Sequence, residues 1–195
     1  MSARDHILAD VRRALDGADR SPVTVPRGYR DTPSADVDLF VERVADYRAV
    51  VVRCAADEVE QRIAEALPSG ARVVVPQGLQ WRVDGAATDT GLTSNELDSV
   101  DAVVTGATVG VATTGTIVLS HGAGEGRRAL TLVPDVHVCV VRADQVVADV
   151  PDAVAVLDPQ RPTTWISGPS ATSDIELNRV EGVHGPRTLH VIVVG

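Results

Sequence analysis

The chain has 195 residues, enough for one medium domain with a substantial hydrophobic core. All 18 of its basic side chains are arginine, and 27 acidic side chains outnumber them, giving a net charge of −9. This charge argues against nucleic acid and anionic membranes as general partners. The absence of lysine excludes a Walker phosphate loop, a Schiff-base lysine and a pyridoxal phosphate anchor.

Aromatic residues make up only 3% of the chain, so the core must consist of Val, Ala, Leu and Ile, which suits buried sheet. Cys54 and Cys139 lie in apolar, strand-like runs without CxxC spacing. We therefore expect no disulfide, metal or iron–sulfur site built from this chain alone. We also expect no membrane span and no signal peptide, and hence a cytoplasmic location.

Residues 3–16 place apolar side chains at helical spacing and predict an amphipathic helix. We assign this helix to a segment of residues 1–20, followed by a Pro-, Gly- and Arg-containing linker over residues 21–35. Such a helix docks either on its own domain, which is the simpler alternative, or on a partner. The main domain is then predicted to cover residues 36–195.

The main domain opens with alternating helix and strand patterns. They are helix 37–47, strand 49–54, helix 57–67, strand 72–76 and, after a loop containing Trp81, strand 101–105. This alternation is typical of a parallel sheet with right-handed crossovers. Trp81 lies near a carboxyl strand end, where it acts either as a lid over the core edge or as a ligand platform.

The central region, residues 102–142, contains strand patterns without a long helix between them. It therefore predicts an antiparallel or mixed portion. The glycine-rich run 121–128 resembles a dinucleotide loop, but the strand-like run 129–134 follows it where such a loop needs a helix. We interpret it as a hairpin-like turn. The predicted fold is a three-layer α/β/α domain with a mixed, mainly parallel sheet.

A polar segment between the apolar runs 163–166 and 189–194 is the predicted site. It lies where an open α/β sheet places its ligand crevice, beyond the strand ends. Ser170, Thr172 or Ser173 would cap a helix whose first free N–H groups suit an anion. The structural alternative is a capped crossover with two turns.

Three further features bear on the site, two in this region and one in the glycine-rich run 121–128. Gly168, followed by proline, predicts a fixed turn. His184, before Gly185, is either a catalytic histidine or a hydrogen-bonding strut. Arg127 and Arg128 form an adjacent guanidinium pair that suits a carboxylate or phosphate, unless they simply solubilise a surface turn.

Taken together, residues 36–195 resemble the LUD family, and within it the C-type lactate-utilisation proteins. The matching motifs are Thr114-Gly-Thr-Ile-Val-Leu119, Gly126-Arg-Arg128, Leu132-Val-Pro134 with His137, Ser167-Gly-Pro-Ser-Ala-Thr-Ser-Asp-Ile-Glu176, and Gly182-Val-His-Gly-Pro-Arg187. They occur in order and with matching spacing, which makes the set far more specific than any single motif.

The resemblance implies a fold like that of CoA transferases, ribose-5-phosphate isomerase and glucosamine-6-phosphate deaminase. It also implies a part in oxidising L-lactate to pyruvate within a three-protein system. The other two members, of A type and B type, carry iron–sulfur clusters, so this chain is expected to hold no cofactor. The expected ligand is a small carboxylate such as lactate.

Under this hypothesis Arg187, or Arg127 with Arg128, pairs with the carboxylate. His184 accepts the hydroxyl proton, with Asp174 as the second catalytic candidate. The other expected substrate-binding residues are Thr114, Gly115, Gly168, Ser170, Thr172, Ser173, Glu176 and Gly185. Family members often have a glutamate where this chain has Thr113, which argues against a carboxylate nucleophile in that loop.

Two other functions stay open. The first is a free-standing transferase or isomerase, with the Gly/Thr loop 113–116 holding a phosphate or thioester; the missing acid and the absence of lysine argue against it. The second is a non-catalytic scaffold or ligand sensor that docks through the N-terminal helix. A Ser–His–Asp hydrolase is disfavoured because residues 168–172 do not read GxSxG and Asp174 is too close to Ser170 in sequence.

Overall fold

The computed structural model describes residues 2–26, 34–168 and 185–195, which divide into two compact units, Met1–Asp31 and Thr32–Gly195. The first unit contains helix α1 (Ala3–Ala14). Ser2 caps this helix in a capping box with Asp5. No residue of the helix is buried, and Ile7 and Val11 of its apolar stripe are exposed. Among the described residues, no helix has the length and apolar character needed to cross a membrane.

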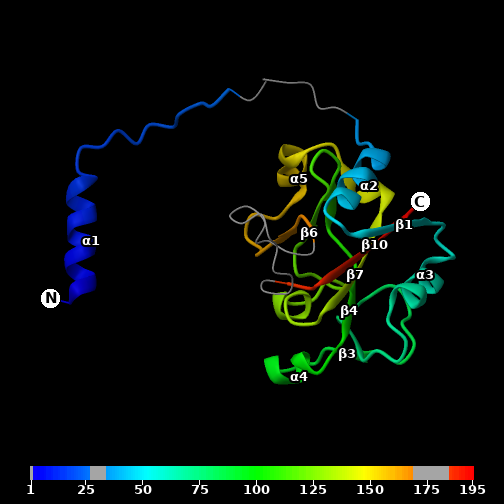
Figure 1. The fold of residues 1–195 in the computed structure, drawn as a ribbon. Coiled ribbons are helices and arrows are strands. Elements are labelled where there is room, and N and C mark those ends of the chain that lie inside the picture. Colours follow the sequence, from blue (N-terminus) through cyan, green and yellow to red (C-terminus); the bar gives the residue numbers. More distant parts are fainter. Residues whose placement is uncertain (1, 27–33, 169–184) are drawn as a thin grey trace. The chain divides into compact units, whose positions relative to one another are not determined.

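The second unit is organised around a main sheet whose described strands are all parallel and follow the order β1–β10–β7–β4–β2–β3 (Figure 1). The strands are β1 (Val50–Cys54), β2 (Val73–Val75), β3 (Ala87–Thr88), β4 (Ala102–Thr105), β7 (Val136–Arg142) and β10 (Thr188–Val194). Because they are parallel, all their carboxyl ends lie at one edge, here called the carboxyl edge. Their amino ends form the opposite, amino edge.

Helices α2 (Val37–Asp46) and α3 (Val59–Ala66) cover opposite faces of this sheet near β1. Two further helices, α4 (Ser94–Asp98) and α5 (Val150–Val156), lie away from β1. Successive residues of β10 point to opposite faces, so Val191 packs with Phe40 of α2, whereas Ile192 packs with Ile63 of α3. This arrangement confirms the predicted α/β class with a mainly parallel sheet.

A second, smaller sheet packs on the face of the main sheet that α2 covers. Its strands are β8 (Val146–Val147), β5 (Val109–Val111), β6 (Thr116–Leu119) and β9 (Thr164–Ile166), in the order β8–β5–β6–β9. Ile117 and Leu119 share a core cluster with Phe40, whereas Val118 points to the other side and packs with Ala153 of α5. The β5–β6 and β6–β9 pairs are antiparallel, which confirms the expected mixed portion.

The connection from β6 to β7 corrects one prediction. Arg128–Thr131 forms a 3-10 helix, η1, instead of the expected strand, and a second one, η2, covers Ala143–Gln145. The loop before η1 is not a hairpin either, because β6 and β7 belong to different sheets. A short apolar run does not distinguish a strand from a buried helical turn by periodicity, and here the fully buried Leu130 anchors the turn.

Candidate functional site

A loop of residues 120–127 covers the carboxyl edge of the main sheet. The N–H of Gly106, just after β4, donates to the carbonyl of Gly124 at 2.8 Å, and the N–H of Gly124 donates to the carbonyl of Gln77 at 2.8 Å. Gly126 has a φ of +72°, and a Cβ there would lie 2.6 Å from Leu130 Cδ1. The glycines of this run therefore serve close approach of the backbone to the strand ends.

Glu125 places a buried carboxylate inside this loop. Only 8% of the residue is exposed. Its Oε1 accepts a hydrogen bond from Thr108 Oγ1 at 2.6 Å, and its Oε2 accepts one from the Ser120 N–H at 2.6 Å. A buried carboxylate requires such donors, and hydrogen bonds to a charged group are about twice as strong as neutral ones.

His121 fixes the loop to the smaller sheet. Its Nδ1 lies 2.8 Å from the Gly126 carbonyl, which only accepts, so Nδ1 carries the hydrogen. In the neutral ring Nε2 then accepts from Thr164 Oγ1 at 2.9 Å. Both ring nitrogens are used, so His121 acts as a strut between the loop and β9.

Beneath the loop, three polar side chains lie on the same face of β4 and β7. His137 Nε2 is 2.8 Å from Thr105 Oγ1, and burial together with the nearby charge of Arg128 lowers the pKa of His137 to about 4. Burial raises the pKa of the Cys139 thiol to about 12, so it stays protonated at neutral pH. At neutral pH this imidazole is therefore neutral and this thiol is protonated.

Cys54 and Cys139 are free and buried, and they lie in different core clusters. In the part of the chain that the structure describes, no group of three or more His, Cys, Asp and Glu side chains is placed to hold a metal ion.

The loop separates two cavities at the carboxyl edge. The inner crevice, of about 50 Å³, lies at the ends of β4 and β7 and is bordered by Trp81, Gly106, Glu125, Arg142 and Gln145. The outer hollow, of about 510 Å³, lies on the other side of the loop and is open to solvent. Crevices beyond the carboxyl ends of parallel strands are the usual ligand sites of such sheets.

The predicted arginine pair lies at this edge but is already engaged. Arg127 forms a bidentate ion pair with Asp89, with Nε–Oδ2 at 2.8 Å and Nη2–Oδ1 at 3.0 Å. These hydrogen bonds lower the pKa of the Asp89 carboxyl. Arg128 Nη1 donates to the carbonyl and hydroxyl of Thr131 at 3.0 and 3.1 Å. The carboxylate partner of Arg127 is thus part of the chain itself.

Arg187 lies at the opposite, amino edge, because it directly precedes β10. Its Nη1 is 2.7 Å from Asp135 Oδ2, and both side chains are more than half exposed. Gly185 lies two residues earlier, on the same side of β10. The structure therefore does not bring Arg187 to Arg127, which is paired at the carboxyl edge.

Three of the predicted site residues do lie together, at the C-terminal end of α2. The hydroxyl of Thr116 links Thr114 Oγ1 and Ser167 Oγ through two hydrogen bonds of 2.8 Å. Gly115 and Gly168 both have a positive φ, and a Cβ on either would come within 2.8 Å of the end of α2. The remaining predicted residues lie outside the described residues: Ser170, Thr172, Ser173, Asp174, Glu176 and His184.

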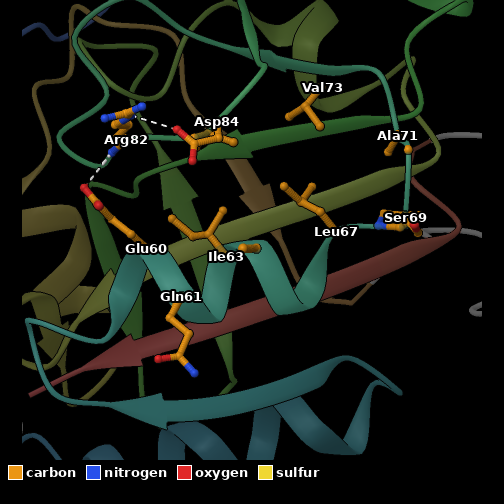
Figure 2. Close-up of a pocket in the computed structure, with 13 residues that line it drawn as sticks. Glu60, Gln61, Ile63, Leu67, Ser69, Ala71, Val73, Arg82 and Asp84 are labelled. Atoms are coloured by element: carbon orange, nitrogen blue, oxygen red, sulfur yellow. Dashed lines mark hydrogen bonds and ion pairs between the residues drawn. The ribbon is translucent and has the colours of Figure 1, made fainter.

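A further cavity is an open groove beside α3, of about 660 Å³ (Figure 2). Ile63 and Leu67 lie along its α3 side, and Glu60, Arg82 and Asp84 gather at one end (Figure 2). The backbone N–H of Arg82 donates to Glu60 at 2.9 Å, and its side chain pairs with Asp84 in an exposed ion pair. These polar groups form hydrogen bonds and an ion pair with one another, so few of them are available to bind a ligand in the groove.

The residues of the inner crevice are not adjacent in the sequence and were not predicted as one site. Of these residues, only Trp81 was considered as a ligand platform, with a lid over the core edge as the alternative. Arg142 and Gln145 carried no local signal. A signal was nonetheless present, because Thr105 and Arg142 end two strand patterns, and parallel neighbours bring their carboxyl ends to one edge.

Residues 33–194 match the family model described as the LUD domain. A Deinococcus radiodurans protein named lactate utilization protein C is 44% identical over 205 aligned residues, covering 99% of this chain and 96% of that protein. The crystal structure of a DUF162 family protein from Deinococcus radiodurans superimposes with a TM-score of 0.71 at 42% identity, covering 82% of this chain and 96% of that one. A Bacillus pumilus protein also named lactate utilization protein C is 37% identical over 92 residues, covering 43% of this chain and 38% of that protein. The chain belongs to the LUD domain family.

Proposed function

We propose that this chain is a component of a system that oxidises L-lactate to pyruvate. The observation that carries the proposal is the 44% identity to a protein named lactate utilization protein C, over 99% of this chain and 96% of that protein. Because the similarity covers nearly all of both chains, it includes the carboxyl edge and the segment that follows β9.

The roles proposed for this chain and for its partner subunits follow from the chemistry of the reaction. Oxidation of L-lactate releases two electrons and two protons, and the electrons pass to iron–sulfur clusters held by the A-type and B-type partner subunits. Cys54 and Cys139 are buried in separate clusters of the core, and burial raises the pKa of both thiols. This chain therefore binds the small carboxylate or assembles with the redox subunits.

The carboxyl edge is the favoured place for the substrate. It carries the buried Glu125 and the inner crevice, whereas Arg187 at the amino edge is paired with Asp135 on an exposed surface. The roles predicted for His184 and Asp174, which follow β9 in the chain, stay part of the proposal.

A free-standing transferase or isomerase is less well supported. That function needs the backbone of the Gly/Thr loop, residues 113–116, to face a phosphate or thioester. Gly115 instead packs against α2, where a Cβ would lie 2.6 Å from the carbonyl carbon of Arg43. Helix α2 therefore occupies the space beside this loop that a phosphate or thioester would need.

Co-purification from the native cell tests the proposal. A tagged chain should bring down two iron–sulfur proteins, and L-lactate-dependent reduction of an artificial electron acceptor should appear in the complex and not in the chain alone. Recovery of the chain alone, from a lysate that contains those proteins, would contradict the proposal and favour a sensor or an independent enzyme.

A further inference from the structure

The inner crevice brings together a buried acceptor and an available cation. Glu125 contributes a carboxylate held by two donors at 2.6 Å. Arg142, the last residue of β7, contributes a guanidinium whose Nε donates to Asp144 Oδ1 at 3.0 Å. Within the described residues its two terminal nitrogens have no hydrogen-bond partner, and 42% of the side chain is exposed. The lining of the crevice thus includes one residue with a hydrogen-bond acceptor and one with free donors.

The walls of the crevice are fixed by contacts to the backbone. Gln145 Nε2 donates to the Ala107 carbonyl at 2.7 Å, and its Oε1 accepts from the Arg142 N–H at 2.9 Å. Trp81 forms another wall, with Cζ3 3.8 Å from the position that a methyl group on Gly106 would take. Rigid walls hold the donor and the acceptor at a constant separation.

The volume of the crevice limits its ligand to a few heavy atoms. It measures about 50 Å³. One water needs roughly 10–15 Å³, so the crevice has room for about three to five water-sized groups; this excludes a nucleotide, a CoA thioester or a sugar phosphate and sets a compact acid of two or three carbons as the upper limit.

We propose that the inner crevice binds a small 2-hydroxy monocarboxylate. The ligand carboxylate accepts hydrogen bonds from the terminal nitrogens of Arg142, and its hydroxyl donates to Glu125. Trp81 covers the carbon chain. The choice of a 2-hydroxy acid rests on the proposed function, whereas the structure itself supplies the observation that Glu125 and Arg142 both line a crevice of this size.

Tryptophan fluorescence measures this binding. The chain has two tryptophans, and Trp165 lies on β9 with 40% exposure, so a Trp165→Phe chain reports on Trp81 alone. L-lactate should change this fluorescence saturably. Propionate has the same carboxylate and no hydroxyl, and it should bind about ten-fold more weakly because the hydrogen bond to Glu125 is lost.

Two substitutions in this background test the two ends of the site. Arg142→Gln removes the charged donor. Gly106→Ala places a methyl group in the crevice at ordinary contact distances, 3.7 Å from the Gly124 carbonyl oxygen and 3.8 Å from Trp81, at a position without a positive φ. Each should raise the dissociation constant for L-lactate by about ten-fold or more, at an unchanged melting temperature.

Arg53→Gln is the matched control. Arg53 also forms an ion pair, with Asp38, and its side chain is 43% exposed, nearly the same as Arg142. It lies on β1, away from the crevice, so its loss should leave L-lactate binding unchanged.

Equal L-lactate affinity in the Arg142→Gln, Gly106→Ala and unmodified crevices would overturn the inference, as would equal affinity for propionate and L-lactate. A lack of any saturable response, in the chain alone and in its complex with the iron–sulfur partners, would overturn it too. If the complex oxidises L-lactate but Arg142→Gln has no effect, only the crevice assignment fails. If the crevice binds L-lactate but the chain has no iron–sulfur partners, only the proposed function fails.

Discussion

The two edges of the main sheet use charged side chains in different ways. At the carboxyl edge, Glu125 is buried and accepts hydrogen bonds from a hydroxyl and a backbone N–H. It belongs to a loop whose glycines let the backbone lie close to the strand ends. At the amino edge, Arg187 and Arg72 pair with Asp135 and Asp101, and all four side chains are about half exposed or more.

This difference is the reason for placing the proposed site at the carboxyl edge. An exposed ion pair typically contributes about 0–1 kcal/mol and is weakened by salt, so the amino edge tolerates change. A buried carboxylate is costly unless it is fully hydrogen-bonded, and protein structures keep such groups where binding or chemistry uses them. A charged residue seen in the sequence is therefore weaker evidence for a site than a charged side chain that the fold buries.

The largest effect should come from two glycines with the same backbone conformation at opposite edges. Gly126 and Gly70 both have a φ of +72°, but a Cβ would meet Leu130 and Pro76 at Gly126 and open space at Gly70. Gly126→Ala should therefore lower the free energy of unfolding by about 3 kcal/mol, and Gly70→Ala by about 1 kcal/mol. Urea denaturation measures both values, and equal losses would show that the carboxyl edge is not tightly packed.

His137, which is buried on the face of β7 that also carries Cys139, should make the free energy of unfolding depend on pH. Its pKa is about 4 in the folded chain and 6.5 in the unfolded chain, so below pH 6.5 only the unfolded chain takes up this proton. The stabilisation is fully present above pH 6.5 and is lost as the pH falls toward 4, by about 3 kcal/mol in total. His137→Asn should remove this part of the slope in urea denaturation between pH 7 and pH 4.5. An unchanged slope would mean that His137 is accessible to protons.

Acidic residues at the two edges should respond differently to truncation. Glu125→Ala removes the acceptor of the Thr108 hydroxyl and the shorter of the two hydrogen bonds of the Ser120 N–H, which keeps only Thr108 Oγ1 at 3.2 Å, and it should cost about 1–2 kcal/mol. Asp101→Ala removes an acceptor for Arg72 at a position where the side chain is 46% exposed, and it should cost much less. Denaturation midpoints measure both losses of stability. A larger loss for Asp101→Ala than for Glu125→Ala would contradict the difference between the two edges.

The smallest effect should be that of Arg187→Ala. The guanidinium is 60% exposed and pairs with an equally exposed Asp135, so the free energy of unfolding should change by no more than about 0.5 kcal/mol. L-lactate binding should also be unchanged. A clear loss of L-lactate binding in this variant would indicate that the site lies at the amino edge.

Much of the fold could be predicted because its elements have local patterns. The strands at 50–54, 73–75 and 102–105 and the helix at 59–66 follow from apolar periodicity and from bounding Gly and Pro residues. The turn at Arg128–Thr131 was predicted as a strand because its short apolar run fits both structures, and only the burial of Leu130 decides between them.

The candidate site was less accessible to sequence reasoning. The pairing of Arg127 with Asp89 joins residues 38 positions apart, so the adjacent arginines looked available in the sequence. Trp81, Glu125 and Arg142 come together only because β4 and β7 are neighbours and the glycine loop folds back over their ends. Strand order and loop direction are tertiary properties, and no local spacing records them.

A crystal structure of the chain soaked with L-lactate tests the central claim most directly. We expect the ligand in the inner crevice, with its carboxylate on Arg142 and its hydroxyl on Glu125, and the Arg127–Asp89 pair intact. L-lactate bound beside Arg187 at the amino edge, or on an Arg127 released from Asp89, would contradict the assignment of the inner crevice as the substrate site.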